Sequence, residues 1–195
     1  MKHATLCAVA LSFLPMGAAA ATVINFDDLG PSVVVGSTYA GVTFVDATTD
    51  QFFLAGYSAP TIIRSSSATY QPQQASPIQA VFAAAASFVS LTGLDIGANG
   101  YVLKAFDAMS GGNLVQMASF TGVDIGVGTF QTLSVSGPSI WRVEFSQIAE
   151  TGVGDGMAFD DFTYELAAVP VPASLPLMLA GLGGLGLLAR RRKSS

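Results

Sequence analysis

Cysteine and histidine are almost absent from this sequence of 195 residues. The single cysteine, Cys7, and the single histidine, His3, both lie in the first 21 residues. A chain that loses this segment cannot form a disulfide, the usual cysteine- and histidine-based zinc site or a nucleophilic site that needs histidine as its base. No glycine-rich phosphate-binding motif precedes a helix pattern either. Most familiar catalytic classes are therefore excluded, and we do not expect an enzyme.

Positive charge is also scarce over most of the chain. Of the eight cations, Lys2 and residues 190–193 belong to the two ends, which leaves Arg64, Lys104 and Arg142 in residues 22–168. All thirteen acidic residues lie in that range, so its net charge is −10. Nucleic acid and anionic membrane surfaces are poor partners for such a segment. Divalent cations and neutral or metal-bridged polysaccharides are compatible with it.

The N-terminus has the pattern of a secretory signal peptide. Lys2 provides a short positive region, residues 4–14 are apolar, and the small residues 17–21 offer a cleavage site after Ala20 or Ala21. Lipid attachment at Cys7 is not expected, because it lies inside the apolar stretch and follows Leu6 rather than a small residue. We therefore predict a signal peptide over residues 1–21 and an exported domain over residues 22–168.

The C-terminus has the pattern of a membrane stop. Residues 175–189 carry no charge, and counting back to Val171 gives 19 apolar or small residues, close to the roughly 20 that a membrane-spanning helix needs. Four cations follow, as expected of a cytoplasmic flank: Arg190, Arg191, Arg192 and Lys193. A buried core helix is disfavoured, because four adjoining charges would be hard to solvate. We predict a transmembrane helix over residues 175–189.

A proline motif, Val169-Pro170-Val171-Pro172-Ala173, precedes this helix and carries a family resemblance. The segment resembles the PEP-CTERM class of sorting signals, most closely the variant that reads Val-Pro-Leu-Pro-Ala. The resemblance implies processing by an exosortase, a membrane protease or transpeptidase, and association with exopolysaccharide and biofilm. No glutamate lies between the prolines, and a valine replaces the usual leucine, so the exosortase subtype stays open. The expected processing motif is Val169, Pro170, Val171, Pro172, Ala173 and Ser174.

The backbone chemistry of this motif agrees with processing. Prolines at positions 170, 172 and 176 lack an N–H group and have a fixed φ, so they cannot join a regular helix interior. Residues 169–174 should therefore be extended and open to an enzyme at the membrane surface. We expect the mature protein to lose its tail near this segment.

Alternating apolar residues predict an all-β domain. In residues 141–146 Trp141, Val143 and Phe145 share one face, and residues 161–166 alternate in the same way. Glycine-rich turns, including one at residues 136–138, separate the candidates, and no amphipathic helix appears. We predict an antiparallel β-sandwich of the jelly-roll or carbohydrate-binding-module type, with Trp141 in its core. Further strands are expected at residues 22–26, 41–45, 51–54, 61–64, 87–94, 101–107, 114–120 and 130–135.

Acidic doublets near both ends of the domain suggest a metal site. The first and last strands of a sandwich often lie close together. Carboxylates from both could then share a Ca²⁺ ion, which takes six to eight oxygen ligands, as in the structural sites of many carbohydrate-binding modules. The alternative is that these acids are solvated strand ends. The candidate ligands are Asp27, Asp28, Asp155, Asp160 and Asp161.

Aromatic residues in loops are weaker candidates for sugar binding. Tyr39, Tyr57 and Tyr70 lie in loop-like sequence, where they could stack on a glycan or form ordinary surface. Tyr70 belongs to the polar, proline-containing stretch at residues 65–77, which we interpret as a long exposed connector. The paired acids could also serve a glycosidase, but short loops leave little room for a deep cleft.

Two functional classes remain. The first is a non-catalytic surface or extracellular-matrix protein that signal peptidase and an exosortase process, anchored transiently in the membrane and associated with exopolysaccharide. The second is a calcium-dependent carbohydrate-binding module with a defined glycan ligand. An aromatic platform on one sheet face would favour the second class, and its absence would favour the first.

Overall fold

A computed structural model describes residues 20–51, 60–66, 76–98, 100–122, 129–148 and 157–168, together with residues 178 and 181. The chain divides into one unit of residues 19–167 and another of its two terminal segments. Residues 1–19 of the predicted signal peptide, the proline motif and most of the predicted transmembrane helix lie outside the described residues. Within them, no helix is long and apolar enough to cross a membrane.

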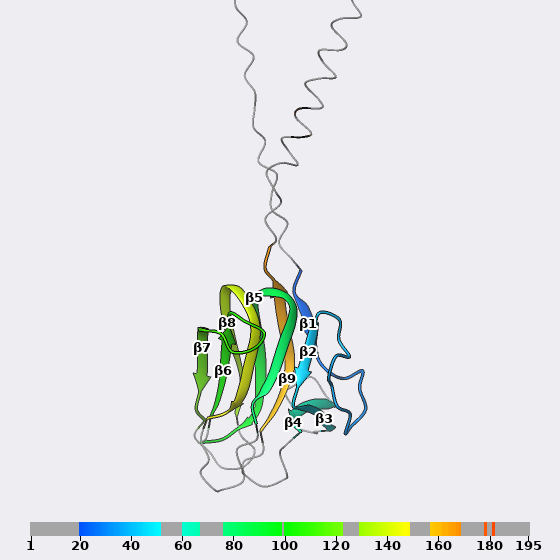
Figure 1. Cartoon of the computed structure of the whole chain (residues 1–195). Helices are drawn as coiled ribbons and strands as arrows, with labels where there is room; N and C mark the ends of the chain where they lie inside the picture. The colour runs from blue at the N-terminus through cyan, green and yellow to red at the C-terminus, as the bar shows by residue number, and fades with distance from the viewer. Residues whose placement is uncertain are drawn as a thin grey trace, which may run out of the picture. The chain divides into compact units, whose positions relative to one another are not determined.

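The domain consists of antiparallel β-strands, which confirms the all-β prediction (Figure 1). One hydrogen-bonded sheet has the strand order β3-β4-β9-β5-β8-β6-β7, while β1 pairs with β9 and β2 pairs with β5. The strands are β1 (Thr22–Ile24), β2 (Val42–Val45), β3 (Ala47–Gln51), β4 (Thr61–Ser65), β5 (Ile78–Ile96), β6 (Tyr101–Phe106), β7 (Leu114–Phe120), β8 (Thr129–Gln147) and β9 (Ala158–Leu166).

Two long strands bend and divide this sheet into two layers. Residues 78–82 of β5 pair with β2 and the end of β8, whereas residues 86–94 pair with β9 and the start of β8. The register shifts between these halves, and the curved paths of both strands are visible in Figure 1. The first layer thus holds β2, β6, β7 and one half of each long strand. The second layer holds β1, β3, β4, β9 and the other halves.

The predicted turn at residues 136–138 is wrong, because β8 runs through it as one strand. The glycine and proline signal instead marks an irregularity: Ser136 pairs with Phe88, and the next partners are Ile140 and Ala86. Pro138 has no N–H for the ladder, so it is tolerated at such a break. The break also moves Ile140 into the core, and Trp141 is only partly buried.

Aromatic side chains fill the space between the layers. Phe145 of β8 lies 4.9 Å from Phe159 of β9, and Phe44 of β2 lies 5.1 Å from Phe162, measured between ring centroids. Phe82 stacks on Phe162 at 6.3 Å. Because Phe44 and Phe162 belong to strands that share no backbone pairing, this edge-to-face contact is made across the core, between the two layers. Edge-to-face aromatic pairs stabilise the folded state by more than the burial of their apolar surface alone.

The terminal strands are neighbours, as the sequence suggested. β1 pairs with β9 in a register that places Ile24 opposite Phe162. Residues 52–54 of the strand expected at 51–54 lie outside the described residues, and Gln51 is the last residue of β3 (Ala47–Gln51). The sequence of β3 does not show clear alternation of apolar residues, because one of its inward-facing residues, Thr49, is polar. Thr49 is fully buried, and its hydroxyl donates to the carbonyl of Gly30 at 2.7 Å.

Candidate functional site

The first acidic doublet lies in the loop that follows β1. Phe26 adopts a positive φ of 59° and turns the chain there. The backbone N–H of Thr61 then donates to Asp27 Oδ1 at 3.1 Å, and the side-chain amide of Asn25 donates to Asp27 Oδ2 at 2.9 Å. The Tyr39 hydroxyl donates to Asp28 Oδ1 at 2.5 Å. Protein donors therefore engage both carboxylates and tie this loop to neighbouring segments.

Tyr39 is a structural anchor in this arrangement. Its ring contacts Phe26 and Phe44 edge-on, with centroid distances of 5.8 and 6.5 Å. Burial raises the pKa of the Tyr39 hydroxyl well above its ordinary value, and the hydrogen bond and negative charge of Asp28 raise it further. The hydroxyl thus remains a neutral donor to Asp28 at physiological pH.

The second acidic doublet lies within β9. Asp160 is fully buried, and its Oδ1 accepts the backbone N–H of Asp161 at 2.7 Å. Asp161 has a positive φ of 51°, and the register with β5 shifts between Ser90 and Thr92. Both features describe a β-bulge, which redirects side chains on a strand. The doublet is therefore part of an irregular strand rather than a solvated strand end.

Only part of the predicted metal site can be placed. The pairing of β1 with β9 brings the segments that carry the two doublets next to each other in the second layer. Asp155 lies outside the described residues, as do Tyr57, Tyr70, the proline motif and the four terminal cations. Among the described side chains, no three or more acidic, cysteine or histidine residues are grouped to hold a metal. Calcium binding stays a prediction.

A buried arginine forms a cluster that the sequence analysis missed. Arg142 is only 7% exposed, although its strand pattern predicted an outward position. Its guanidinium carbon lies 4.3 Å from the ring centroid of Phe106. Nη2 donates to the carbonyl of Gly111 at 2.9 Å, and Nη1 lies 3.3 Å from Glu144 Oε1. The strand register places Arg142 opposite Phe106. The contact of Arg142 with the turn, at Gly111, is seen only in the structure.

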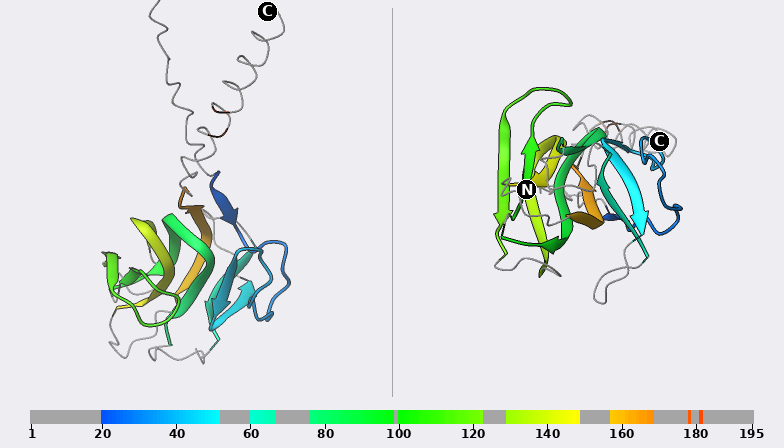
Figure 2. Two further views of the ribbon diagram at one scale, coloured as in Figure 1. Left: turned by 45° about the horizontal axis from the view of Figure 1, so that its top comes forward. Right: turned by 90° about the horizontal axis from the view of Figure 1, so that it is seen from below.

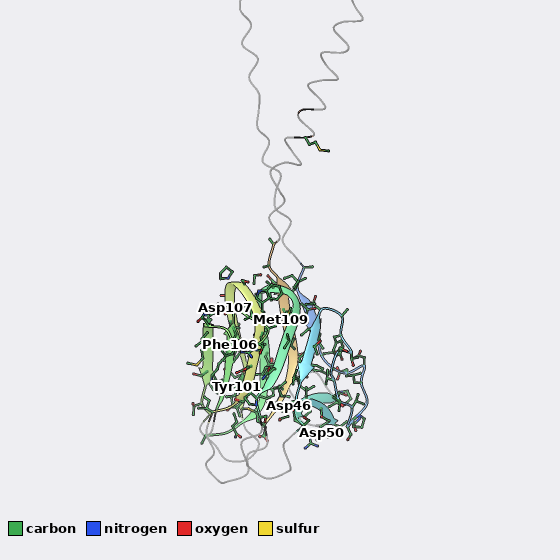
Figure 3. The ribbon with its side chains drawn as sticks, viewed as in Figure 1. Asp46, Asp50, Tyr101, Phe106, Asp107 and Met109 are labelled. Carbon is green, nitrogen blue, oxygen red and sulfur yellow. The ribbon has the colours of Figure 1, made fainter. Side chains whose placement is uncertain are left out.

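This turn connects β6 to β7 and is itself tightly bonded. Asp107 Oδ1 accepts the backbone N–H of Asn113 at 2.6 Å, and Oδ2 accepts its side-chain amide at 3.0 Å. These bonds hold the pKa of the Asp107 carboxyl below its ordinary value. Gly112 has a positive φ of 83°, and a Cβ there would lie 2.6 Å from Asp107 Oδ1. Figure 3 shows Phe106, Asp107 and Met109 together at this end of the hairpin.

The PEP-CTERM protein-sorting motif matches residues 168–193 of the chain. The match confirms the resemblance of the tail and indicates an exported protein. It covers the terminal segment alone, and the motif serves sorting rather than catalysis. No curated protein matches the chain.

Several solved structures resemble the domain at low sequence identity. The K2 cleaved adhesin domain of Lys-gingipain has a TM-score of 0.49 and 12% identity, over 74% of this chain and 99% of that one. The carbohydrate-binding module CBM29-2 has a TM-score of 0.40 and 11% identity, over 76% and 87%. The module CBM6cm-2 of Cellvibrio mixtus lichenase 5A, solved with cellotriose, has a TM-score of 0.33 and 12% identity, over 76% and 98%.

Proposed function

We propose that this protein is a non-catalytic component of a bacterial cell surface or extracellular matrix, exported and then processed by an exosortase. The observation that carries the proposal is the sorting motif at residues 168–193. Within it a proline pair, an uncharged run and four cations follow one another in the order that such a tail requires. After removal of the tail, residues 22–168 would act as the mature domain and associate with exopolysaccharide.

The described surface of the domain supports a non-catalytic role. Its exposed large hydrophobic residues are valine, leucine, isoleucine and methionine, and the described residues include no exposed aromatic platform of the kind that stacks on sugars. The carboxylates of Asp27 and Asp28 accept hydrogen bonds from Thr61, Asn25 and Tyr39. These acids hold the fold together, which favours a structural surface protein over a glycosidase.

Intact-mass analysis of the native protein tests the processing step. We expect a mature species that ends near residues 169–174 and lacks residues 175–195. The double substitution Pro170→Ala and Pro172→Ala should leave the tail attached, because it allows the motif to become helical. Pro31→Ala, far along the sequence from the tail, provides the matched control and should be processed normally. Native protein that retains residues 175–195 would exclude this proposal.

A calcium-dependent carbohydrate-binding module is the second candidate. It is favoured by the pairing of β1, which precedes the first acidic doublet, with β9, which contains the second. The test is co-sedimentation of the mature protein with the extracellular polysaccharide of the producing organism, with Ca²⁺ and with EDTA. Binding that EDTA abolishes would support this candidate, and Asp27→Asn should weaken it. Binding unaffected by EDTA would exclude the calcium site, and no binding would leave the structural role.

A further inference from the structure

Most open strand edges in this domain are covered. The outer edge of β3 is paired with the segment before β2: the N–H of Ser32 donates to the carbonyl of Thr49 at 2.8 Å, and the N–H of Val35 donates to that of Ala47 at 3.0 Å. On β2, the N–H of Phe44 donates to the carbonyl of Gly36 at 2.8 Å. Residues 32–36 thus protect two strands from pairing with other chains.

Other edges are short or occupied by side chains. β1 has three residues, too few to offer an extended template. In the first half of β8, the carbonyl of Thr132 accepts the side-chain amide of Gln131 at 3.0 Å. The carbonyl of Gln131 accepts the Tyr101 hydroxyl at 2.7 Å, and the N–H of Ser136 donates to the side chain of Gln116.

β7 differs from all of these edges. It ends the strand order and pairs with β6 along its length, and within the described part of the chain no other backbone segment pairs with it. In both views of Figure 2 the hairpin of β6 and β7 lies at one margin of the molecule. Its sequence, LVQMASF, contains neither a charge nor a proline, the two devices that commonly block an edge.

Apolar side chains extend along this edge strand and its turn. Leu114 is 51% exposed and Met117 is 53% exposed, and Met109 in the preceding turn is 47% exposed. The bonds between Asp107 and Asn113, together with the contact of Arg142 with Gly111, fix the turn. Little conformational entropy would therefore be lost when a partner binds this hairpin.

We propose that β7 pairs antiparallel with β7 of a second copy of this chain, about a two-fold axis that crosses the strand. A two-fold interface places one surface patch against itself, so each strand must be compatible with its own sequence. An uncharged strand meets this condition. With a net charge of −10 over residues 22–168, copies repel over most of their surface, and the neutral edge is where they can approach. A partner selected by charge would instead need charged groups on β7.

Cysteine scanning in the full chain tests this proposal directly, because Cys7 is the only native cysteine. In a Cys7→Ala background that is exported normally, single cysteines are placed at positions 114–120 and the protein is exposed to a mild oxidant. Opposite residues of an antiparallel pair have Cα atoms about 4.5 or 5.5 Å apart, within disulfide range. Only the residue at the two-fold axis faces itself, so cross-linking should peak at one position. Val34→Cys, at a 70% exposed site away from β7, is the control.

A charge substitution provides the second measurement. Met117→Lys places two cations beside each other in the paired strands, so full-length protein in detergent and mature protein in buffer should sediment as monomers. Val34→Lys should leave the dimer unchanged, and circular dichroism should show that both variants fold. Cross-linking no higher than in the Val34→Cys control would overturn the proposal. So would a disulfide only to a different protein, or a dimer that Met117→Lys leaves intact.

Discussion

The strands at the two ends of the sheet order, β3 and β7, differ in how far their outer edges are protected from pairing with another chain. At β3 the chain folds back and pairs residues 32–35 with the strand, and Asp50 on that strand forms an ion pair with Arg64 at 3.1 Å. At β7 the described structure shows neither a covering segment nor a charge. In Figure 3, Asp46 and Asp50 lie in the lower part of the domain, and Asp107 and Met109 lie in its upper part. One edge is closed within the chain, and the other is available to a partner.

Removal of the arginine beneath the β6–β7 turn should have the largest effect. Arg142→Ala deletes the contact with Phe106 and the hydrogen bond to Gly111. We expect a loss of about 2–3 kcal/mol in the free energy of unfolding, because a buried side chain with charged hydrogen bonds is truncated. Urea denaturation measures this loss. Lys104→Ala, on the neighbouring strand, is the control and should change stability by less than about 1 kcal/mol.

Opening the covered edge should cost less. Thr49→Val keeps the side-chain shape but removes the hydroxyl that accepts the N–H of Val33 at 2.8 Å and donates to Gly30. The expected loss is about 1–2 kcal/mol. Hydrogen exchange should accelerate at residues 32–35 and stay unchanged in β6. Equal acceleration of exchange at residues 32–35 and in β6 would show that the two regions are not independent.

High pH should loosen the covered side through Tyr39. Because the pKa of Tyr39 is raised in the folded state, its contribution is complete below pH 10 and declines as the pH rises above that value. Tyr39→Phe should cost about 1 kcal/mol at neutral pH. Above pH 10 the native protein should lose stability more steeply than this variant. Parallel alkaline unfolding curves for the two proteins would contradict this role.

Low pH should act on the other side, through a small and local effect. The pKa of Asp107 is lowered in the folded state, so its contribution is present above the unfolded value near 4 and is lost as the pH falls through the folded pKa. The protection factor of the Asn113 amide, which corrects its exchange rate for the intrinsic pH dependence of exchange, should therefore fall in acid. Asp107→Asn has no carboxyl at this position and should show a protection factor that depends less on pH.

The prediction of the fold succeeded where the signal was local. The sequence pattern identified strands at residues 101–107, 114–120 and 161–166, which correspond to β6, β7 and β9. It failed at β8, where Gly137 and Pro138 suggested a turn but lie at a break inside one strand. Turn residues have the same local chemistry in a hairpin and in a bulge. Only the partner strand distinguishes these two cases.

The candidate site shows the same division. The tail motif could be recognised from the sequence because its proline pair, uncharged run and cations follow one another within residues 168–193. The burial of Arg142 could not, since its alternation with Val143 predicts exposure until the neighbouring turn is placed over it. The acidic doublets could be listed from the sequence as candidate ligands, yet the bonds of Asp27 to Thr61 and of Asp28 to Tyr39 depend on contacts between distant segments.

The sequence by itself therefore determined the sorting signal, the β class of the domain and its strong negative charge. These follow from composition and from patterns that repeat within a few residues. The tertiary structure decided where β5 and β8 bend between layers, which acids are bonded and which strand edge remains open. The physical reason is that backbone pairing and burial depend on segments far apart in the chain: residues 32–36 close one edge, and the described residues supply no such cover for β7.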